Sequence, residues 1–138
     1  MDKGEMMKAR VIIAGSREFT DEKVIFKECD LIIKKGFGLK PEEVEIVSGC
    51  ATGVDTIGEK YSRQRGYSLK RFPAHWKENG KLAGLKRNSQ MAEYACEKGY
   101  KGILIAFPLQ GRSAGTWDMI RKAGDNGLDV YIFEQKDA

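Results

Sequence analysis

The stretch Val11–Arg17, which reads VIIAGSR, decides the fold because an apolar run ends there in a glycine-bearing loop. The same pattern recurs in Val44–Asp55 (VEIVSGCATGVD) and in Ile103–Phe107 (ILIAF), which Gly111–Thr116 (GRSAGT) follows. Each loop leads into a segment with the features of a helix. Unbroken apolar runs are typical of parallel strands that are buried on both faces of a sheet. In such a sheet all three loops lie along the carboxyl edge, where ligands bind.

These three loops have the features of a phosphate-binding crevice. Glycine lets backbone N–H groups approach a ligand closely, and the N-terminus of a helix carries partial positive charge. One such loop is weak support for a phosphate site, whereas three on one edge of a sheet predict a shared crevice. The net charge of +4 also suits a polyanionic ligand or nucleic acid. The basic residues form separate pairs, such as Lys70-Arg71 and Lys86-Arg87, rather than one block.

Composition limits the class of protein. The 138 residues suffice for one domain, residues 1–138, and 41% hydrophobic with 32% charged residues is typical of a soluble globular protein. No apolar stretch has the length needed to cross a membrane, so we expect no membrane partner. Cys29, Cys50 and Cys96 are odd in number and widely spaced, which favours a reduced, cytoplasmic setting over a disulfide framework. With a single histidine the chain offers no cluster of metal ligands, and we expect neither a metal nor a cofactor.

Strands alternate with helices along the chain, which predicts an α/β domain with right-handed crossovers. The expected strands are Lys8–Ala14, Val44–Ser48, Tyr67–Phe72, Lys101–Phe107 and Leu128–Phe133. The expected helices are one that Thr20–Lys23 opens and Gly36 ends, one from Gly53 to Arg65, Leu85–Glu97 and Thr116–Ala123. We expect Ala74–Gly84 to be a loop that carries a tryptophan.

Two common nucleotide-binding motifs are missing from the sequence. Gly15–Phe19 lacks the Gly-x-Gly-x-x-Gly spacing, and Ser48-Gly49 stands at the end of the second strand, where an acid would hold a ribose. There is also no Gly-Lys-Ser/Thr signature of a P-loop. The sequence therefore disfavours a conventional NAD-dependent dehydrogenase and a Walker-type NTPase.

Four short motifs in order along the chain resemble the SLOG superfamily, and within it the YspA, or cpYpsA-related, family. They are Gly15–Arg17 (GSR), Ser48–Asp55 (SGCATGVD), Ala83–Asn88 (AGLKRN) and Ala114–Asp118 (AGTWD). The resemblance implies a Rossmann-like domain that binds nucleotides or nucleotide-derived ligands. The superfamily also holds the LOG phosphoribohydrolases, whose Gly-Thr loop is similar to the fourth motif. It includes the DprA proteins, which bind single-stranded DNA and whose glycine loop is similar to the second.

We expect a single Rossmann-like, three-layer domain whose five parallel strands have the order 3-2-1-4-5. The crevice then lies where the order reverses, between the first and fourth strands, with Gly15–Arg17 facing Gly111–Thr116 and Ser48–Asp55 alongside. The candidate ligand-binding residues are Gly15, Ser16, Arg17, Ser48, Gly49, Ala51, Thr52, Gly53, Asp55, Arg87, Asn88, Gly115 and Thr116.

Several of these residues have a structural role as an alternative. The Ser16 hydroxyl suits a phosphate contact or a helix cap, and the Arg17 guanidinium suits a two-pronged phosphate clamp or an ordinary surface position. Asp55 suits a helix cap, a contact that orients the loop, or an acceptor for a ribose hydroxyl. Trp76 suits stacking on a nucleobase or packing of its own loop.

The favoured function is binding of a nucleotide or nucleotide-derived ligand, including ADP-ribose-like compounds, by a sensor or sequestering module. The first alternative is LOG-like hydrolysis of a nucleoside monophosphate. LOG enzymes follow Gly-Thr with adjacent acids, including a glutamate tied to catalysis. This chain has Trp117-Asp118 there and lacks the tandem glycines. Asp118 is thus the candidate catalytic residue, and Asp55 is the other available acid.

The second alternative is DprA-like binding of single-stranded DNA. Such binding needs a basic track with aromatic platforms. Tyr67 and Trp76 beside Lys70-Arg71 weakly indicate such a track. The sequence leaves assembly into a homo-oligomer open.

Overall fold

The computed structural model describes residues 9–136, and within them five strands form one fully parallel sheet. The strands are β1 (Ala9–Gly15), β2 (Val44–Ser48), β3 (Ser68–Arg71), β4 (Lys101–Phe107) and β5 (Asp129–Ile132). Their order in the sheet is β3-β2-β1-β4-β5. The predicted Rossmann-like α/β fold and its strand order are therefore confirmed. Lys8, the predicted first residue of the first strand, lies outside the described residues.

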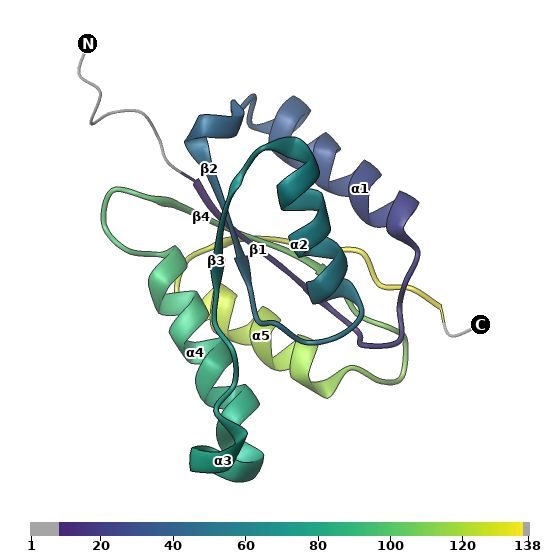
Figure 1. The fold of residues 1–138 in the computed structure, drawn as a ribbon, viewed down its shortest axis with the longest axis vertical. Coiled ribbons are helices and arrows are strands. Elements are labelled where there is room, and N and C mark those ends of the chain that lie inside the picture. The colour runs from purple at the N-terminus through teal and green to yellow at the C-terminus, as the bar shows by residue number, and fades with distance from the viewer. Residues whose placement is uncertain (1–8, 137–138) are drawn as a thin grey trace.

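Helices cover both faces of the sheet (Figure 1). They are α1 (Glu22–Asp30), α2 (Val54–Arg65), α3 (Trp76–Asn79), α4 (Ala83–Ala95) and α5 (Ala114–Asp125). Figure 1 shows the sheet between the pair α1 and α2 and the pair α4 and α5, with the short α3 beyond the N-terminal end of α4. None of the helices in residues 9–136 has both the length and the apolar character that a membrane crossing requires.

The unbroken apolar run of β1 is explained by its central place in the sheet. Val11 and Ile13 pack into the core on the α1–α2 side, and Ile12 and Ala14 pack into the core on the α4–α5 side. Alternate side chains of a strand point to opposite faces, so a strand covered on both faces has no polar side. All four side chains are buried.

Several elements begin or end one or two residues from their predicted bounds, and two segments differ from the prediction in kind. Ala74–Gly84, expected as a loop, contains α3, a 3-10 turn (η4, Gly80–Leu82) and the start of α4. A four-residue helix is too short to show a hydrophobic period, and Gly80 at φ +57° ends it. The first helix reaches Gly36 as expected, but Leu31–Gly36 (η2) is wound as a π-helix, which buries the adjacent Ile32 and Ile33.

The carboxyl ends of β1 and β4 meet at the point where the strand order reverses. Gly15 pairs in register with Phe107, and the Ser16 N–H donates to the Phe107 carbonyl at 3.1 Å. From β1 the chain continues through α1 to β2 on one side, whereas β4 leads through α5 to β5 on the other. The two connections diverge here and leave room for a ligand.

Candidate functional site

A cavity of about 470 Å³ lies at this reversal point. Its lining comes from the end of β1 and the loop after it, from the loop before α2 and the start of α2, from the segment from α3 into α4, and from the loop before α5 and the start of α5. Nine of the candidate ligand-binding residues line it: Gly15, Ser16, Arg17, Ala51, Asp55, Arg87, Asn88, Gly115 and Thr116. Residues that lie far apart in the sequence thus share one concave surface at the carboxyl edge.

Four other candidates are not among the described residues that line the cavity: Ser48, Gly49, Thr52 and Gly53. Gly53 has φ +78°, and a Cβ there would lie 2.5 Å from the carbonyl oxygens of both Ser16 and Arg17. The neighbouring Val54 N–H donates to the Ser16 carbonyl at 3.2 Å. Gly53 therefore allows the second loop to pack against the first, which is a structural requirement of the site.

Ser48 makes its contacts outside the cavity, and Thr52 faces solvent. The Ser48 hydroxyl donates to Glu59 Oε2 at 2.6 Å and accepts the Cys50 N–H at 3.1 Å. Thr52 is exposed. Ser48 thus shapes the start of the loop from beneath, because its side chain is buried against α2.

The N-terminus of α5 opens onto the cavity. Its N-cap residue Ser113 has φ +78°, and its hydroxyl accepts the Leu109 N–H at 3.0 Å instead of capping the helix. Ser113, Gly115 and Thr116 line the cavity. The first N–H groups of a helix have no partner within the helix, and they carry its partial positive charge. An anion in the cavity would accept hydrogen bonds from these N–H groups and would be attracted by this charge.

Arg87 ties the second loop to α4. Its Nη1 donates to the Gly49 carbonyl, and its Nε donates to Asn88 Oδ1 at 3.0 Å. A Cβ on Gly49 would lie 2.8 Å from Arg87 Nη1 and 2.8 Å from Asp55 Oδ2. Glycine at this position thus leaves room for the guanidinium and the carboxylate, which both occupy space that a Cβ would take.

Asp55 is the buried acid of the cavity, with 6% of its surface exposed. Its Oδ2 accepts the Ala51 N–H at 3.3 Å. Burial raises the pKa of the Asp55 carboxyl to about 6, although the Arg87 charge and the backbone of Ala51 and Gly15 lower it. Acids that line a cleft and have a strongly shifted pKa are common at functional sites, so Asp55 is a candidate functional residue.

Asp118 is buried between α4 and α5 and is not among the described residues that line the cavity. It accepts hydrogen bonds from Asn88 Nδ2 at 3.0 Å and Arg121 Nη2 at 2.7 Å, and pairs with Lys122 Nζ at 2.9 Å. Burial acts to raise its pKa, but the contacts with Asn88 and Lys122 outweigh burial and hold the pKa of Asp118 below its usual value. The carboxylate is thus ionised and engaged by its neighbours.

Asn88 connects this ionised carboxylate to the first turn of α5. Besides Asp118, its Nδ2 donates to the Gly115 carbonyl at 3.1 Å, and its side chain is 4% exposed. The Asn88 amide thereby fixes the position of the first turn of α5 relative to α4. Asn88 contributes to the cavity wall, and its polar atoms are used within the protein.

The further residues that line the cavity include Trp76, for which the sequence leaves base stacking or loop packing open, and the cationic Lys81 and Arg112, which the sequence pattern does not select. Lys81 follows α3, whose helical character the sequence does not reveal. Arg112 lies in the third glycine loop, from which the sequence pattern selects only Gly115 and Thr116. Arg112 forms an ion pair with Glu18, which also lines the cavity. With Arg17 and Arg87, the cavity is lined by four cationic side chains against the two acids Glu18 and Asp55.

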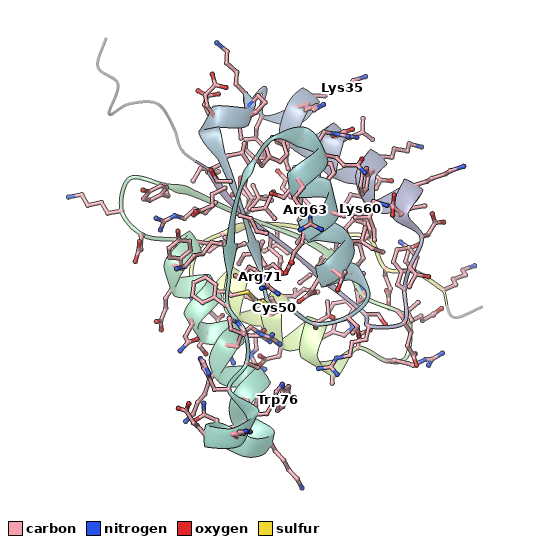
Figure 2. All side chains as sticks on the ribbon, in the orientation of Figure 1. Lys35, Cys50, Lys60, Arg63, Arg71 and Trp76 are labelled. Carbon is pink, nitrogen blue, oxygen red and sulfur yellow. The ribbon has the colours of Figure 1, made fainter. Side chains whose placement is uncertain are left out.

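The aromatic platforms expected for single-stranded DNA do not form a track. Tyr67 is buried in the core with Tyr61 and Phe26, so its ring is inaccessible to a base. Arg71 lies beside Cys50 (Figure 2), where it donates to Glu59 Oε2 at 3.2 Å. Trp76 instead lines the cavity.

Comparison with known families supports the resemblance seen in the motifs. The sequence model described as "YspA, cpYpsA-related SLOG family" matches residues 9–78. This match spans β1 to α3 and includes the first two glycine loops. Searches of curated proteins and of solved structures gave no match.

Proposed function

This chain belongs to the YspA, cpYpsA-related SLOG family, and on that premise we propose that it binds a nucleotide or nucleotide-derived ligand in the cavity between β1 and β4. Membership of this family favours a nucleotide-related ligand but does not specify one. The identity of the base and of the phosphate groups must be sought in the chemistry of the cavity.

The observation that carries the proposal is the uncapped N-terminus of α5 facing a cavity lined by Arg17, Lys81, Arg87 and Arg112. Helix N-termini with free N–H groups bind phosphate, and guanidinium groups add charge-assisted hydrogen bonds. Two acids in the same cavity leave an excess of positive charge. An anionic group of the ligand is therefore assigned to the β1–α5 end of the cavity.

Asp55 adds a requirement that inorganic phosphate does not meet. A buried carboxylate repels phosphate, but it is a strong acceptor for a hydroxyl group. A ribose beside the phosphate offers such hydroxyls. The cavity of about 470 Å³ also falls within the range of small-ligand sites, roughly 300–1,000 Å³. A phosphorylated nucleoside fits this combination of charge, hydrogen bonding and size.

We propose binding without turnover, in a sensor or sequestering module, because the expected catalytic acid is not available. Asp118 is held ionised by Asn88, Arg121 and Lys122. A general acid must hold a proton and reach the ligand. Asp118 meets neither requirement, since its carboxylate is engaged by these three side chains.

One observation favours hydrolysis of the N-glycosidic bond as a second candidate function. Asp55 lines the cavity, and its pKa of about 6 lets it carry a proton close to neutral pH. A carboxyl group with such a pKa is suited to general acid catalysis. In this alternative Asp55, rather than Asp118, protonates or orients the departing base.

A thermal-shift panel tests the binding proposal. At a hundredfold excess over Kd, a ligand stabilises the folded state by about 2.7 kcal/mol, which corresponds to a rise of roughly 10 °C in Tm for a domain of this size. We expect such a rise for one group of nucleoside mono-, di- or cyclic phosphates or ADP-ribose-type compounds, and none for unphosphorylated nucleosides. If every phosphorylated compound fails at millimolar concentration, the proposal is wrong.

A further inference from the structure

We infer that Trp76 is the platform on which the ligand's nucleobase stacks, so that the ligand class is a nucleoside phosphate rather than a sugar phosphate or inorganic phosphate. This inference rests on the proposed function, because it concerns the other end of the same cavity. It assigns to Trp76 the part of recognition that selects for an aromatic base.

Trp76 is more exposed than a tryptophan that packs α3 against the core would be. Its surface is 51% exposed, although it lines the cavity, and no residue of α3 is buried. Figure 2 shows its indole beside the start of α4, at the end of the molecule that α3 forms. A tryptophan that served only to fix α3 to the core would bury most of its rings, because apolar burial is what such an anchor contributes.

Gly84 lies next to both the Trp76 indole and the Arg87 guanidinium. A Cβ on Gly84 would lie 3.6 Å from Trp76 Cη2 and 3.7 Å from Arg87 Nη2. The indole edge and the guanidinium therefore flank the same glycine in the first turn of α4. An aromatic ring placed at Gly84 would lie beside the indole, while the rest of the ligand extends past Arg87.

The two ends of the cavity differ in chemistry. Trp76 is the only aromatic residue among the described residues that line it, and it comes from the α3–α4 segment together with Leu85. At the other end lie Ser113, the N-cap residue of α5, and Gly115 and Thr116 in the first turn of that helix. A nucleoside phosphate has the matching asymmetry, with an aromatic base at one end and an anion at the other.

Stacking of this kind has a measurable size. Alanine substitution of an aromatic platform typically weakens binding of a base by roughly 5- to 100-fold, with little dependence on the identity of the base. A sugar phosphate has no ring to stack, so its affinity is independent of the platform. The difference between the two ligands isolates the stacking contact from the anion contact.

The experiment uses the Trp117→Phe variant, in which Trp76 is the one tryptophan left, since the chain has two. Trp117 is not among the described residues that line the cavity, so this substitution is a matched background. Titration with AMP, GMP and ribose 5-phosphate is followed by tryptophan fluorescence and by calorimetry. We expect saturable quenching by at least one nucleotide, and binding of ribose 5-phosphate without quenching.

In the same background, Trp76→Ala should weaken the nucleotide about tenfold or more and leave ribose 5-phosphate unchanged, whereas Trp76→Phe should retain most of the nucleotide affinity. Equal affinity for the nucleotide and ribose 5-phosphate, or an equal loss of both in Trp76→Ala, would overturn the inference while leaving the phosphate site intact. Failure of every phosphorylated compound to bind would overturn the proposed function as well. The Tm of each unliganded variant establishes that it is folded.

Discussion

Arg87 on α4 and Asp55 on α2 meet beside Gly49, where Arg87 Nη1 and Asp55 Oδ2 each lie 2.8 Å from the place that a Cβ on that glycine would take. This arrangement puts a fixed positive charge beside a buried acid at the wall of the cavity. Both side chains also hold the second loop, since Arg87 donates to the Gly49 carbonyl and Asp55 accepts the Ala51 N–H. The same two groups therefore influence the geometry of the second loop, the charge that a ligand in the cavity can carry, and the stability of the fold.

Arg17→Ala and Arg87→Ala should each weaken the ligand identified by the thermal-shift panel. Loss of a charge-assisted hydrogen bond costs about 1.5–3 kcal/mol, so Kd should rise about tenfold to a hundredfold. Arg17→Ala should leave the free energy of unfolding nearly unchanged because its side chain is exposed, whereas Arg87→Ala should lower it by about 1 kcal/mol through the lost contact with Gly49. Isothermal titration calorimetry and urea denaturation measure both quantities.

Lys86→Ala is the matched control for these variants. Lys86 is the neighbour of Arg87 and carries the same charge, but it is exposed, donates to Asn79 Oδ1 and is not among the described cavity residues. Its removal should change Kd by less than about threefold, the scale of a screened surface charge. If Arg17→Ala and Arg87→Ala both bind like the parent, the ligand lies elsewhere.

Asp55→Asn should stabilise the protein at neutral pH and have no such effect in acid. The folded-state pKa of about 6 lies above the usual 3.8, so the folded state holds the proton more tightly than the unfolded state. The contribution of Asp55 to the free energy of unfolding is therefore most favourable below pH 3.8, and it is lost as the pH rises to about 6. At 1.36 kcal/mol per pKa unit, the gain for the uncharged variant reaches about 3 kcal/mol at pH 7.5.

Urea denaturation of the parent and of Asp55→Asn at pH 3.5 and pH 7.5 measures this gain. Asp125→Asn is the control, since Asp125 is exposed and such a substitution should change the free energy of unfolding by less than about 0.5 kcal/mol at either pH. An Asp55→Asn variant that is less stable than the parent at pH 7.5 would show that Arg87 and the backbone hold the ionised form more strongly than burial opposes it.

The sequence is sufficient to predict the strands of the sheet, because each buried strand is visible as an unbroken apolar run. Val44–Ser48 and Lys101–Phe107 were predicted with their observed bounds, and the three glycine loops fixed the edge at which the cavity lies. The short α3 was missed because four residues show no period, and with it the cavity positions of Trp76 and Lys81. Local pattern predicts extended elements well and single turns poorly.

The sequence could not separate the roles of the two acids, because these depend on distant partners. Lys122 follows Asp118 by four residues on one helix, which the sequence can suggest, but Asn88 lies 30 residues away. The burial of Asp55 likewise results from the packing of loops around Gly49 and Gly53. Such contacts exist only once α2, α4 and α5 have been placed around the sheet.

Gly53→Ala should destabilise the fold far more than Gly66→Ala. The two glycines have nearly the same φ, +78° and +77°, but their ψ values differ. Gly66 has ψ +24°, in the left-handed helical region, where an alanine costs about 1–2 kcal/mol, whereas Gly53 has ψ −127°, outside the regions open to an alanine, where the cost is higher. At Gly66 a Cβ meets nothing within 4 Å, whereas at Gly53 it would lie 2.5 Å from two backbone carbonyl oxygens. Relief of that contact requires the first and second loops to separate.

Urea denaturation of the two variants is the measurement, and thermal shift with the ligand is the second readout. We expect Gly53→Ala to lose at least about 2 kcal/mol more than Gly66→Ala, and to lose ligand binding with it, because the first loop is also part of the cavity. Equal losses of stability in the two variants would mean that the loops separate freely and that their packing contributes little.

Asp118→Asn should lower stability and leave the chemistry of the site unchanged. The ionised carboxylate accepts from Asn88 and Arg121 and pairs with Lys122, so an amide loses charge contacts that join α4 to α5. Because the pKa of Asp118 is lowered in the folded state, its contribution is present at neutral pH and is lost on acidification. The deficit of the variant in urea denaturation should therefore shrink from pH 7 toward pH 3.

Chromatography of AMP, CMP, GMP and UMP after incubation with the parent should show little or no free base. A proton donor must lie within about 3 Å of the leaving base, and a displacement of 1 Å costs roughly a hundredfold in rate. The Asp118 carboxylate is engaged by Asn88, Arg121 and Lys122, and Asp118 is not among the described residues that line the cavity, so it is not such a donor. If base is released and the release is lost in Asp55→Asn but not in Asp118→Asn, the hydrolase alternative is correct, with Asp55 as its acid. Loss of the release in a folded Asp118→Asn variant would instead overturn both the binding-only proposal and the purely structural role of Asp118.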